Sequence, residues 1–353
     1  MNNIFELMKE YQCEELHFRY DQKTGLRTII AINNTELADV TSGGARLYDY
    51  KTEDDALADV LKLSQAMTYK CAAAGINLGG SKAVLWNTEK QKSKDLLKIF
   101  GKFVNDLGGR FRTAVDLGLS NEDGRVIKEV CPYIEGESDN NDGFDCESDV
   151  TALGVIKAMK AGLKFLKGSS SLDSVTIAIQ GLGYVGGYLV EFLQEENAKI
   201  IATDIKPELI DFYRKKYPEI VFVEPDQIIS QKCDIFCPSA IGGIINKQTI
   251  PLLNCTLICG AANNQLLNPE NDIHELEKRR ILYLPDFIAN AGGIIQADVE
   301  IKGGTKQKAI ENTQIIERNI EFILNRYKDS ELTTIDIANE LVKIKLLEKK
   351  NAG

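Results

Sequence analysis

Two lysines and an aspartate in the first third of the chain have the residue types that acid–base catalysis requires. Lys70 and Lys82 adjoin small or apolar segments, and Asp116 lies in the segment TAVDLG. Burial and a neighbouring cation both lower the pKa of a lysine, toward the range in which it acts as a general base. Taken singly, each lysine is better explained as a solvated surface residue. The prediction of a catalytic site therefore depends on their combination, together with the Gly43–Gly44 turn.

A second group of residues has the pattern of a dinucleotide site. Apolar residues 175–180 lead into the motif G-x-G-x-x-G, formed by Gly181, Leu182, Gly183, Tyr184, Val185 and Gly186. The glycines permit a tight turn and a close approach of the backbone to a pyrophosphate, and the following helix N-terminus offers N–H groups to it. Asp204, after the next strand, would bind a ribose hydroxyl and repel a 2′-phosphate, which favours NAD over NADP, although Lys206 opposes this. An ordinary tight turn with a surface aspartate is the alternative.

Hydrophobic periodicity predicts the elements that position these residues. Residues 15–20 and 26–33 have strand patterns around a turn, and a helix capped by Thr52 is expected to run to Lys70. From residue 175 short strands alternate with helices, which is typical of a parallel α/β sheet. The predicted strands of that sheet are residues 175–180, 199–203, 233–237, 256–259 and 282–284. Residues 306–350 are predicted to form two long helices.

The length of 353 residues predicts two domains. The polar, acidic segment 134–149 has the composition of a linker. Helices that follow a nucleotide domain often pack back on the first domain. We therefore predict an α/β fold with a discontinuous substrate and oligomerisation domain, residues 1–148 plus about 325–353, and a doubly wound NAD-binding domain, residues 149–324.

Composition argues against several classes of function. The net charge is −10, whereas a nucleic-acid binder needs a basic face. No apolar run approaches the roughly 20 residues of a membrane helix, and the N-terminus has no signal-peptide core. The two histidines lack a nearby nucleophile motif, which leaves acid–base chemistry to Lys, Asp and Glu.

The eight cysteines have no C-x-x-C spacing, so we expect no metal site. Four of them lie in predicted strands, where they are expected to be small core residues. These are Cys233, Cys237, Cys255 and Cys259. Unpaired thiols in a chain of this size indicate a reducing compartment, the cytoplasm.

Six segments together resemble the glutamate/leucine/phenylalanine/valine dehydrogenase family, in particular its leucine and phenylalanine branch. They occur in order as MTYKCAAAGINLGGSKAV, GRFRTAVDLGLSNED, GLGYVG, DIFCPSAIGGIIN, GAANNQL and PDFIANAGGIIQ. The resemblance extends from about Gly43 through the C-terminal helices. It implies reversible, NAD-dependent oxidative deamination of an L-amino acid to its 2-oxo acid, in a cleft between two domains.

The resemblance also implies roles for individual residues. Lys82 and Asp116 match the catalytic lysine and aspartate, and Lys70 matches the lysine that holds the substrate carboxylate. Backbone contacts to that carboxylate are implied for Gly43 and Gly44. In the cofactor site, Thr151 and Asn290 match residues near the nicotinamide, and Ala240 and Asn263 match residues of the flanking loops.

The implied side-chain pocket is neutral and mostly small, formed by Ser42, Ala114, Ile294 and Ala297. Glutamate enzymes of the family have a lysine where this chain has Ser42. A carboxylate buried without a cation is costly, so glutamate is disfavoured. Branched-chain and aromatic amino acids both remain possible substrates.

One segment departs from the family pattern. A Pro-Ser-Pro-type stretch usually precedes the threonine matching Thr151, whereas this chain has Cys146–Glu147–Ser148–Asp149. A solvated acidic loop is one interpretation. Selection of a cationic amino acid is another, and so is a non-catalytic NAD-binding regulator on the same scaffold. A 2-hydroxyacid dehydrogenase is less consistent, because the histidines lie outside a matching motif.

The family resemblance and the N-terminal strands together predict a homodimer or a higher homo-oligomer, because strands in residues 15–33 could pair across a two-fold axis. The expected small-molecule partners are an amino acid and its 2-oxo acid.

Overall fold

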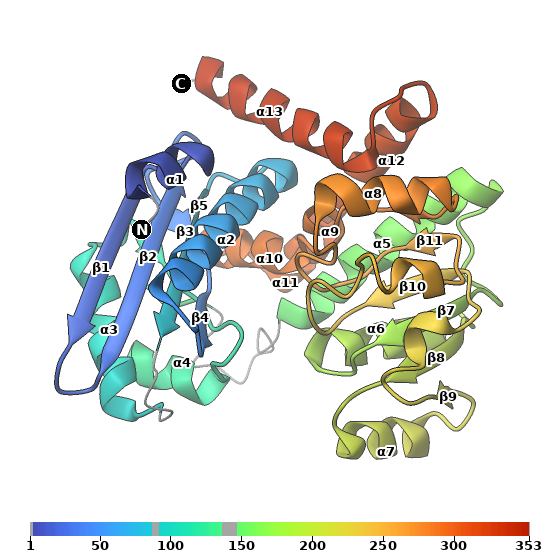
Figure 1. Ribbon diagram of the computed structural model, residues 1–353, viewed down its shortest axis with the longest axis horizontal. Helices are drawn as coiled ribbons and strands as arrows, with labels where there is room; N and C mark the ends of the chain where they lie inside the picture. The colour runs from blue at the N-terminus through green and yellow to red at the C-terminus, as the bar shows by residue number, and fades with distance from the viewer. Residues whose placement is uncertain (1–2, 87–91, 136–146, 353) are drawn as a thin grey trace. The chain divides into compact units, whose positions relative to one another are not determined.

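The chain forms two compact α/β units (Figure 1). The computed structural model describes residues 3–86, 92–135 and 147–352. Unit 1 comprises Met1–Asp145 and Val342–Gly353, and unit 2 comprises Cys146–Leu341. The predicted two-domain α/β class is confirmed. The chain returns from unit 2 to unit 1 after Leu341, whereas the sequence predicted this return near residue 325.

Unit 1 is built on a mixed sheet in the order β1-β2-β5-β3-β6, with β4 also paired to β5. Strands β1, β2 and β5 are antiparallel neighbours, whereas β3 and β4 run parallel to β5. The predicted hairpin is confirmed, and the strands are β1 (Glu15–Asp21), β2 (Leu26–Asn34), β3 (Thr41–Ser42), β4 (Ala45–Tyr48), β5 (Gly79–Trp86) and β6 (Phe111–Arg112).

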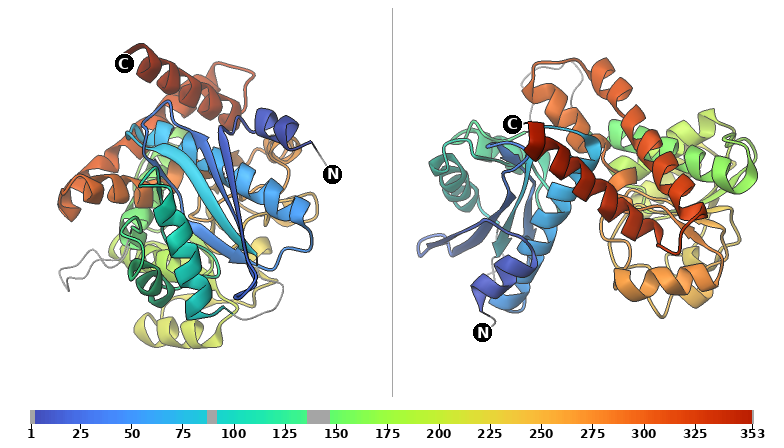
Figure 2. Two further views of the ribbon diagram at one scale, coloured as in Figure 1. Left: turned by 90° about the vertical axis from the view of Figure 1, so that its left-hand side faces the viewer. Right: turned by 90° about the horizontal axis from the view of Figure 1, so that it is seen from above.

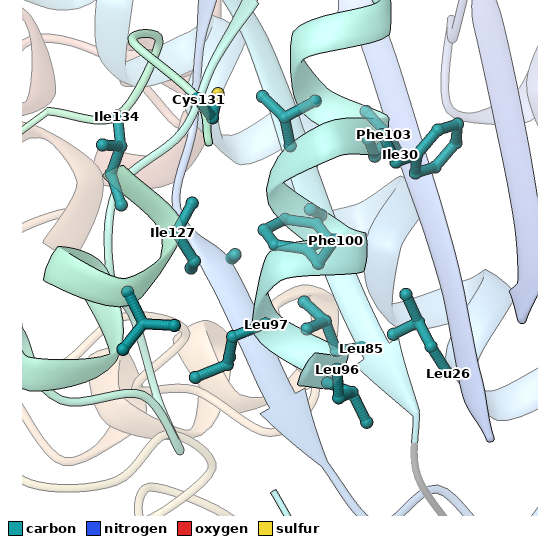
Figure 3. Close-up of a cluster of buried hydrophobic side chains, with 14 of the residues drawn as sticks. Leu26, Ile30, Leu85, Leu96, Leu97, Phe100, Phe103, Ile127, Cys131 and Ile134 are labelled. Carbon is teal, nitrogen blue, oxygen red and sulfur yellow. The ribbon is translucent and has the colours of Figure 1, made fainter. Parts of the chain in front are cut away.

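Helices cover both faces of this sheet (Figure 2). On one face Leu96, Leu97 and Phe100 of α3 (Lys94–Asp106) pack with residues of β2, β5 and α4 (Asn121–Lys128), as Figure 3 shows. The other face is covered by α1 (Ile4–Glu10) and by the long helix α2 (Glu53–Ala74). Helix α2 begins with the predicted Thr52 cap and ends at Gly75, whose φ is 70°. Lys70 therefore lies within α2 and does not end it.

Unit 2 contains a fully parallel sheet in the order β12-β11-β10-β7-β8-β9. The order reverses between β7 and β10, which is the switch point where doubly wound folds bind dinucleotides. This confirms the predicted doubly wound domain. Its strands are β7 (Thr176–Gln180), β8 (Lys199–Thr203), β9 (Val221–Phe222), β10 (Ile235–Pro238), β11 (Leu257–Ile258) and β12 (Leu282–Tyr283).

The helices of unit 2 are α5 (Glu147–Lys167), α6 (Tyr184–Glu195), α7 (Pro207–Lys216), α8 (Pro269–Lys278), α9 (Asp286–Ala289), α10 (Gly292–Ile301), α11 (Lys306–Asn312), α12 (Gln314–Lys328) and the start of α13 (Thr334–Ala352). Residues 306–350 form three helices instead of the predicted two, because the first predicted helix is divided at Thr313. The buried Thr313 hydroxyl donates to the carbonyl of Ile310 and accepts from Lys157, and such bonds compete with continuous helix. None of the described helices is long and apolar enough to span a membrane.

Candidate functional site

Strand alternation determines where Lys82 points. Lys82 lies in β5 and shares a face with Val84 and Trp86, which pack with Leu57 and Leu61 of α2. The opposite face, through Ala83 and Leu85, belongs to the α3 cluster. Lys82 therefore lies on the sheet face that α2 covers, near the end of the apolar cluster between β5 and α2.

Lys82 and Asp116 form an ion pair. Lys82 Nζ lies 2.7 Å from Asp116 Oδ2, and their side chains are 8% and 25% exposed. Burial raises the pKa of Asp116, but the charges of Lys82 and Arg46 outweigh it and lower that pKa to about 2. The carboxylate is therefore ionised at neutral pH. The structure brings together the two groups that the sequence nominated, although they are 34 positions apart.

Arg46 is a second cation beside the same oxygen of Asp116. Its Nε lies 3.4 Å from Asp116 Oδ2, and its guanidinium also contacts Asp59 of α2 at 3.0 Å. Tyr50 donates a hydrogen bond to the same Asp59 oxygen at 2.5 Å. Burial lowers the pKa of Arg46, but the two carboxylates reverse this and raise it. Arg46 was not predicted from the sequence, because its approach to Asp116 depends on the parallel pairing of β4 with β5.

The Gly43–Gly44 turn leaves no room for side chains. A Cβ on Gly43 would lie 1.7 Å from the carbonyl oxygen of Ser81, and one on Gly44 would lie 3.0 Å from Asp116 Cβ and 3.2 Å from Lys82 Nζ. The N–H of Gly43 donates to the carbonyl of Arg112 at 3.1 Å, so a contact from this N–H to a substrate would compete with a sheet hydrogen bond. Glycine at both positions lets the ion pair lie directly against backbone.

Lys70 is carried by the helix that lies over this face. Helix α2 approaches β5 at Gly80, where a Cβ would meet the backbone N of Thr68 at 2.1 Å. Thr68 also donates to Asn33 Oδ1 at 2.7 Å, which ties α2 to β2. Lys70 follows Thr68 by two residues and is half-buried. The small residues around position 80, noted in the sequence, therefore bring the helix close to the strand.

A buried polar cluster surrounds Ser42. Ser42 Oγ donates to Glu135 Oε2 at 2.9 Å, and Arg112 Nε donates to Glu135 Oε1 at 2.8 Å. The Glu135 side chain is only 4% exposed. An ionised carboxylate can only accept hydrogen bonds, so the hydroxyl proton of Ser42 is committed to Glu135. Ser42 and the half-buried Ala114 were predicted from the sequence as pocket residues, whereas Arg112 and Glu135 were not.

The glycine-rich turn of unit 2 has the geometry that its motif requires. Gly181 has a φ of 101°, and a Cβ on Gly186 would lie 2.0 Å from the carbonyl oxygen of Gly181. Gly183, by contrast, faces open space on the described part of the chain. Helix α6 starts at Tyr184 with no side-chain cap at Gly183, so its first-turn N–H groups can bind an anion. Leu182 is buried below the turn, and Val185 continues the helix.

Asp204 is linked directly to this turn. Its Oδ2 accepts from the N–H of Leu182 at 2.7 Å, and its Oδ1 accepts from the N–H of Lys206 at 2.9 Å. Both oxygens keep acceptor capacity beyond these bonds. The carboxylate is therefore held at the carboxyl end of β8, beside the turn.

The other predicted cofactor residues are Ala240 after β10, Asn263 after β11, Asn290 at the end of α9 and Thr151 in α5. A Cβ on Gly181 would meet Ala240 Cβ at 2.7 Å, which places Ala240 against the turn. Asn290 Nδ2 donates to Asn263 Oδ1 at 2.9 Å, and Asn290 Oδ1 is buried with no hydrogen-bond partner on the described part of the chain. Thr151 lies beside the start of α10, since a Cβ on Gly292 would be 2.6 Å from Thr151 Cα.

The remaining predicted positions are also in unit 2. Ile294 and Ala297 are buried residues of α10. The stretch predicted as an acidic loop is partly helical, because α5 begins at Glu147, and Cys146 lies outside the described residues. Asp149 pairs with Lys306 at 2.5 Å. No group of three potential metal ligands occurs on the described residues.

Comparisons with known proteins cover nearly the whole chain. Residues 11–131 match the family model "Glu/Leu/Phe/Val dehydrogenase, dimerisation domain", and residues 143–211 and 203–344 match "Glutamate/Leucine/Phenylalanine/Valine dehydrogenase". Leucine dehydrogenase of Geobacillus stearothermophilus is 38% identical, covering 99% of this chain and 95% of the relative. Phenylalanine dehydrogenase of Lysinibacillus sphaericus is 42% identical, covering 92% and 86%. The crystal structure of L-tryptophan dehydrogenase from Nostoc punctiforme is 35% identical with a TM-score of 0.82, covering 98% and 99%.

Proposed function

Because this chain belongs to the glutamate/leucine/phenylalanine/valine dehydrogenase family, we propose that it oxidatively deaminates an apolar L-amino acid with NAD as the cofactor. The observation that carries the proposal is the shielded Lys82–Asp116 ion pair against the Gly43–Gly44 turn. The relatives named above, which act on leucine, phenylalanine and tryptophan by their names, support the class of substrate.

NAD fits the residues of unit 2. The first-turn N–H groups of α6 and the open space at Gly183 suit a pyrophosphate, and Asp204 suits a ribose hydroxyl. The unpartnered Asn290 Oδ1 is a suitable acceptor for the amide N–H of a nicotinamide. When bound, NAD supplies the hydride acceptor of the reaction.

The proposed mechanism divides the proton transfers between two residues. Lys70 holds the substrate carboxylate as a point charge, which orients the α-carbon. Lys82, once deprotonated, takes a proton from the water that attacks the iminium carbon. Asp116 exchanges protons with the substrate nitrogen as ammonia leaves. When Lys82 loses its proton, one of the two cations that lower the pKa of Asp116 disappears, so Asp116 becomes a better base at that stage.

Side-chain selection is assigned to Ser42, Ala114, Ile294 and Ala297. Ser42 supplies no cation, and its hydroxyl is held by the buried Glu135 carboxylate. Arg112 already pairs with Glu135, so this cluster offers no uncommitted cation to a substrate carboxylate near Ser42, which disfavours acidic amino acids. The pairing of Asp149 with Lys306 leaves that carboxylate neutralised, which speaks against a role in selecting cationic substrates.

A panel of L-amino acids tests this proposal. With NAD and absorbance of NADH as the signal, we expect turnover of leucine, valine, phenylalanine or tryptophan. We expect kcat/KM for glutamate and for lysine at least about 100-fold lower, since an unpaired charge in the pocket costs about 3 kcal/mol or more. Inactivity on every apolar amino acid, in either direction of the reaction, would overturn the assignment. It would favour the alternative of a non-catalytic NAD-binding regulator.

Replacing Asp204 tests the cofactor preference. In Asp204→Asn we expect NADH affinity to fall about 10- to 100-fold, because a hydrogen bond to a charged group contributes about 1.5–3 kcal/mol. Discrimination against NADPH should fall at the same time, because the negative charge is gone. Fluorescence titration with both nucleotides measures this, and Asp211→Asn on the exposed face of α7 is the control. Unchanged affinities for both nucleotides would rule out a ribose contact.

We further propose a homo-oligomer and a cytoplasmic location. Strand β1 lies at the edge of its sheet and exposes Phe18 and Tyr20. An unpaired edge with exposed aromatic side chains suits pairing with a second copy.

A further inference from the structure

Four cysteines of unit 2 occupy opposed positions in or beside two neighbouring strands, β10 and β11. In the parallel ladder of β10 and β11, Ile235 is paired with Leu257, and Phe236 with Ile258. The same register places Cys233 opposite Cys255 and Cys237 opposite Cys259. A separate bridge between Lys232 and Asn254 shows that this register holds before the strands begin. The chain thus contains two cysteine pairs in equivalent register, four residues apart.

The inner pair is shielded and its thiols point to other partners. Cys237 and Cys259 are fully buried. The thiol of Cys237 lies 3.4 Å from Ser239 Oγ, and that of Cys259 lies 3.7 Å from the carbonyl oxygen of Val155. Burial raises the pKa of Cys237 to about 12. Neither thiol is accessible to a reagent in solution.

The outer pair differs in exposure. Cys233 and Cys255 are partly exposed, and the register of the two segments places them opposite each other. The backbone N–H of Cys233 donates to the carbonyl of Asn254 at 3.1 Å, so the two segments of the chain are in contact at this point. Adjacent strands lie about 4.8 Å apart, which falls within the Cα separations of about 4.4–6.8 Å seen in disulfides.

We propose that Cys233 and Cys255 form a reversible disulfide, made by exchange with a low-molecular-weight disulfide such as oxidised glutathione. The bond joins the amino ends of β10 and β11. Ala240 and Asn263 follow the carboxyl ends of the same strands, so the cofactor residues lie at the other edge of the sheet. The modification is therefore compatible with an intact cofactor site.

The exchange proceeds in two balanced steps. Cys255 as thiolate attacks one sulfur of oxidised glutathione, which breaks that S–S bond and releases one glutathione thiolate. Cys233 then loses its proton to water and attacks the sulfur of Cys255, which releases the second glutathione thiolate. The two protein thiols give up two electrons, and the oxidant is reduced to two thiols. The route in which Cys233 attacks first gives the same products, because both cysteines are partly exposed.

Mass spectrometry of the full-length protein tests the proposal. A Cys146→Ser background removes the cysteine outside the described residues. Trypsin cleaves after Lys232, Lys247 and Lys278, so Cys233 and Cys255 fall in separate peptides, residues 233–247 and 248–278. After oxidised glutathione we expect the intact mass to fall by two hydrogens. After alkylation of the remaining free thiols and digestion, we expect the two peptides to be linked. Dithiothreitol should restore the original mass.

The inner pair provides the matched control, because its cysteines fall in the same two peptides. The link should persist in Cys237→Ser and in Cys259→Ser. It should be lost in Cys233→Ser, where Cys255 should instead carry one glutathionyl group, and in Cys255→Ala. A link that survives Cys233→Ser would overturn the proposal. So would a wild-type protein that remains reduced or carries only glutathionyl groups.

Discussion

Lys82→Ala is expected to lower kcat for oxidative deamination by about 10³-fold or more while NADH still binds. A positioned general base contributes about 10²–10⁴-fold, and Lys82 Nζ lies 2.7 Å from Asp116 beside the Gly44 turn. The nucleotide turn lies in unit 2 and contains none of these contacts. Turnover is measured by NADH absorbance, and cofactor binding by NADH fluorescence.

The control for this substitution is Lys98→Ala. Lys98 is also paired with a carboxylate, Glu129 at 2.7 Å, but on the surface of unit 1. Its removal should leave kcat within about two-fold, because exposed ion pairs contribute little. The assignment of Lys82 as the base fails if Lys82→Ala turns over apolar substrates at a near-normal rate. A parallel loss of activity in Lys98→Ala would show that the effect is not specific.

The glycine-rich turn of unit 2 could be predicted from the sequence because its signal is local. Gly181, Gly183 and Gly186 lie within six residues; Gly181 has a positive φ and Gly186 packs against the Gly181 carbonyl, while Gly183 leaves open space at the start of the helix. Asp204 follows from the position of the next strand. The hairpin of β1 and β2 and the capped start of α2 were recognisable for the same reason.

The network around Asp116 depends on tertiary register, which a single sequence does not specify. Arg46 reaches Asp116 only because β4 runs parallel to β5 in the observed register. Ser42 and Glu135 are separated by 93 positions, and their hydrogen bond depends on residues 113 and 134 pairing next to β6. Parallel pairing of such short strands has no strong local pattern. The end of α11 at Thr313 could not be predicted for the same reason. It depends on a buried side-chain hydrogen bond and not on a helix-breaking residue.

Asp116→Asn is expected to impair both catalysis and the stability of unit 1. We expect kcat to fall by about 10²–10⁴-fold, because the amide cannot exchange the proton assigned to Asp116. The free energy of unfolding at pH 7 should fall by about 2 kcal/mol, the equivalent of lowering this pKa from 3.8 to about 2. Trp86 is the single tryptophan and lies in β5, so its fluorescence in a urea titration reports on unit 1.

The pH dependence separates this electrostatic contribution from a packing defect. A carboxyl whose pKa is depressed in the folded state stabilises the protein above its unfolded pKa and loses that contribution as pH falls through the folded value. The stability difference between the wild type and Asp116→Asn should therefore be constant from pH 7 to about 4 and shrink between about 4 and 2. A difference that stays the same over this window would mean that the amide disrupts packing against Gly44, and that Lys82 and Arg46 contribute little through charge. Arg46 is also paired with Asp59, whereas Lys82 lies 2.7 Å from Asp116, so the loss of the Asp116 carboxylate is expected to act mainly by leaving the shielded Lys82 ammonium without this counter-charge.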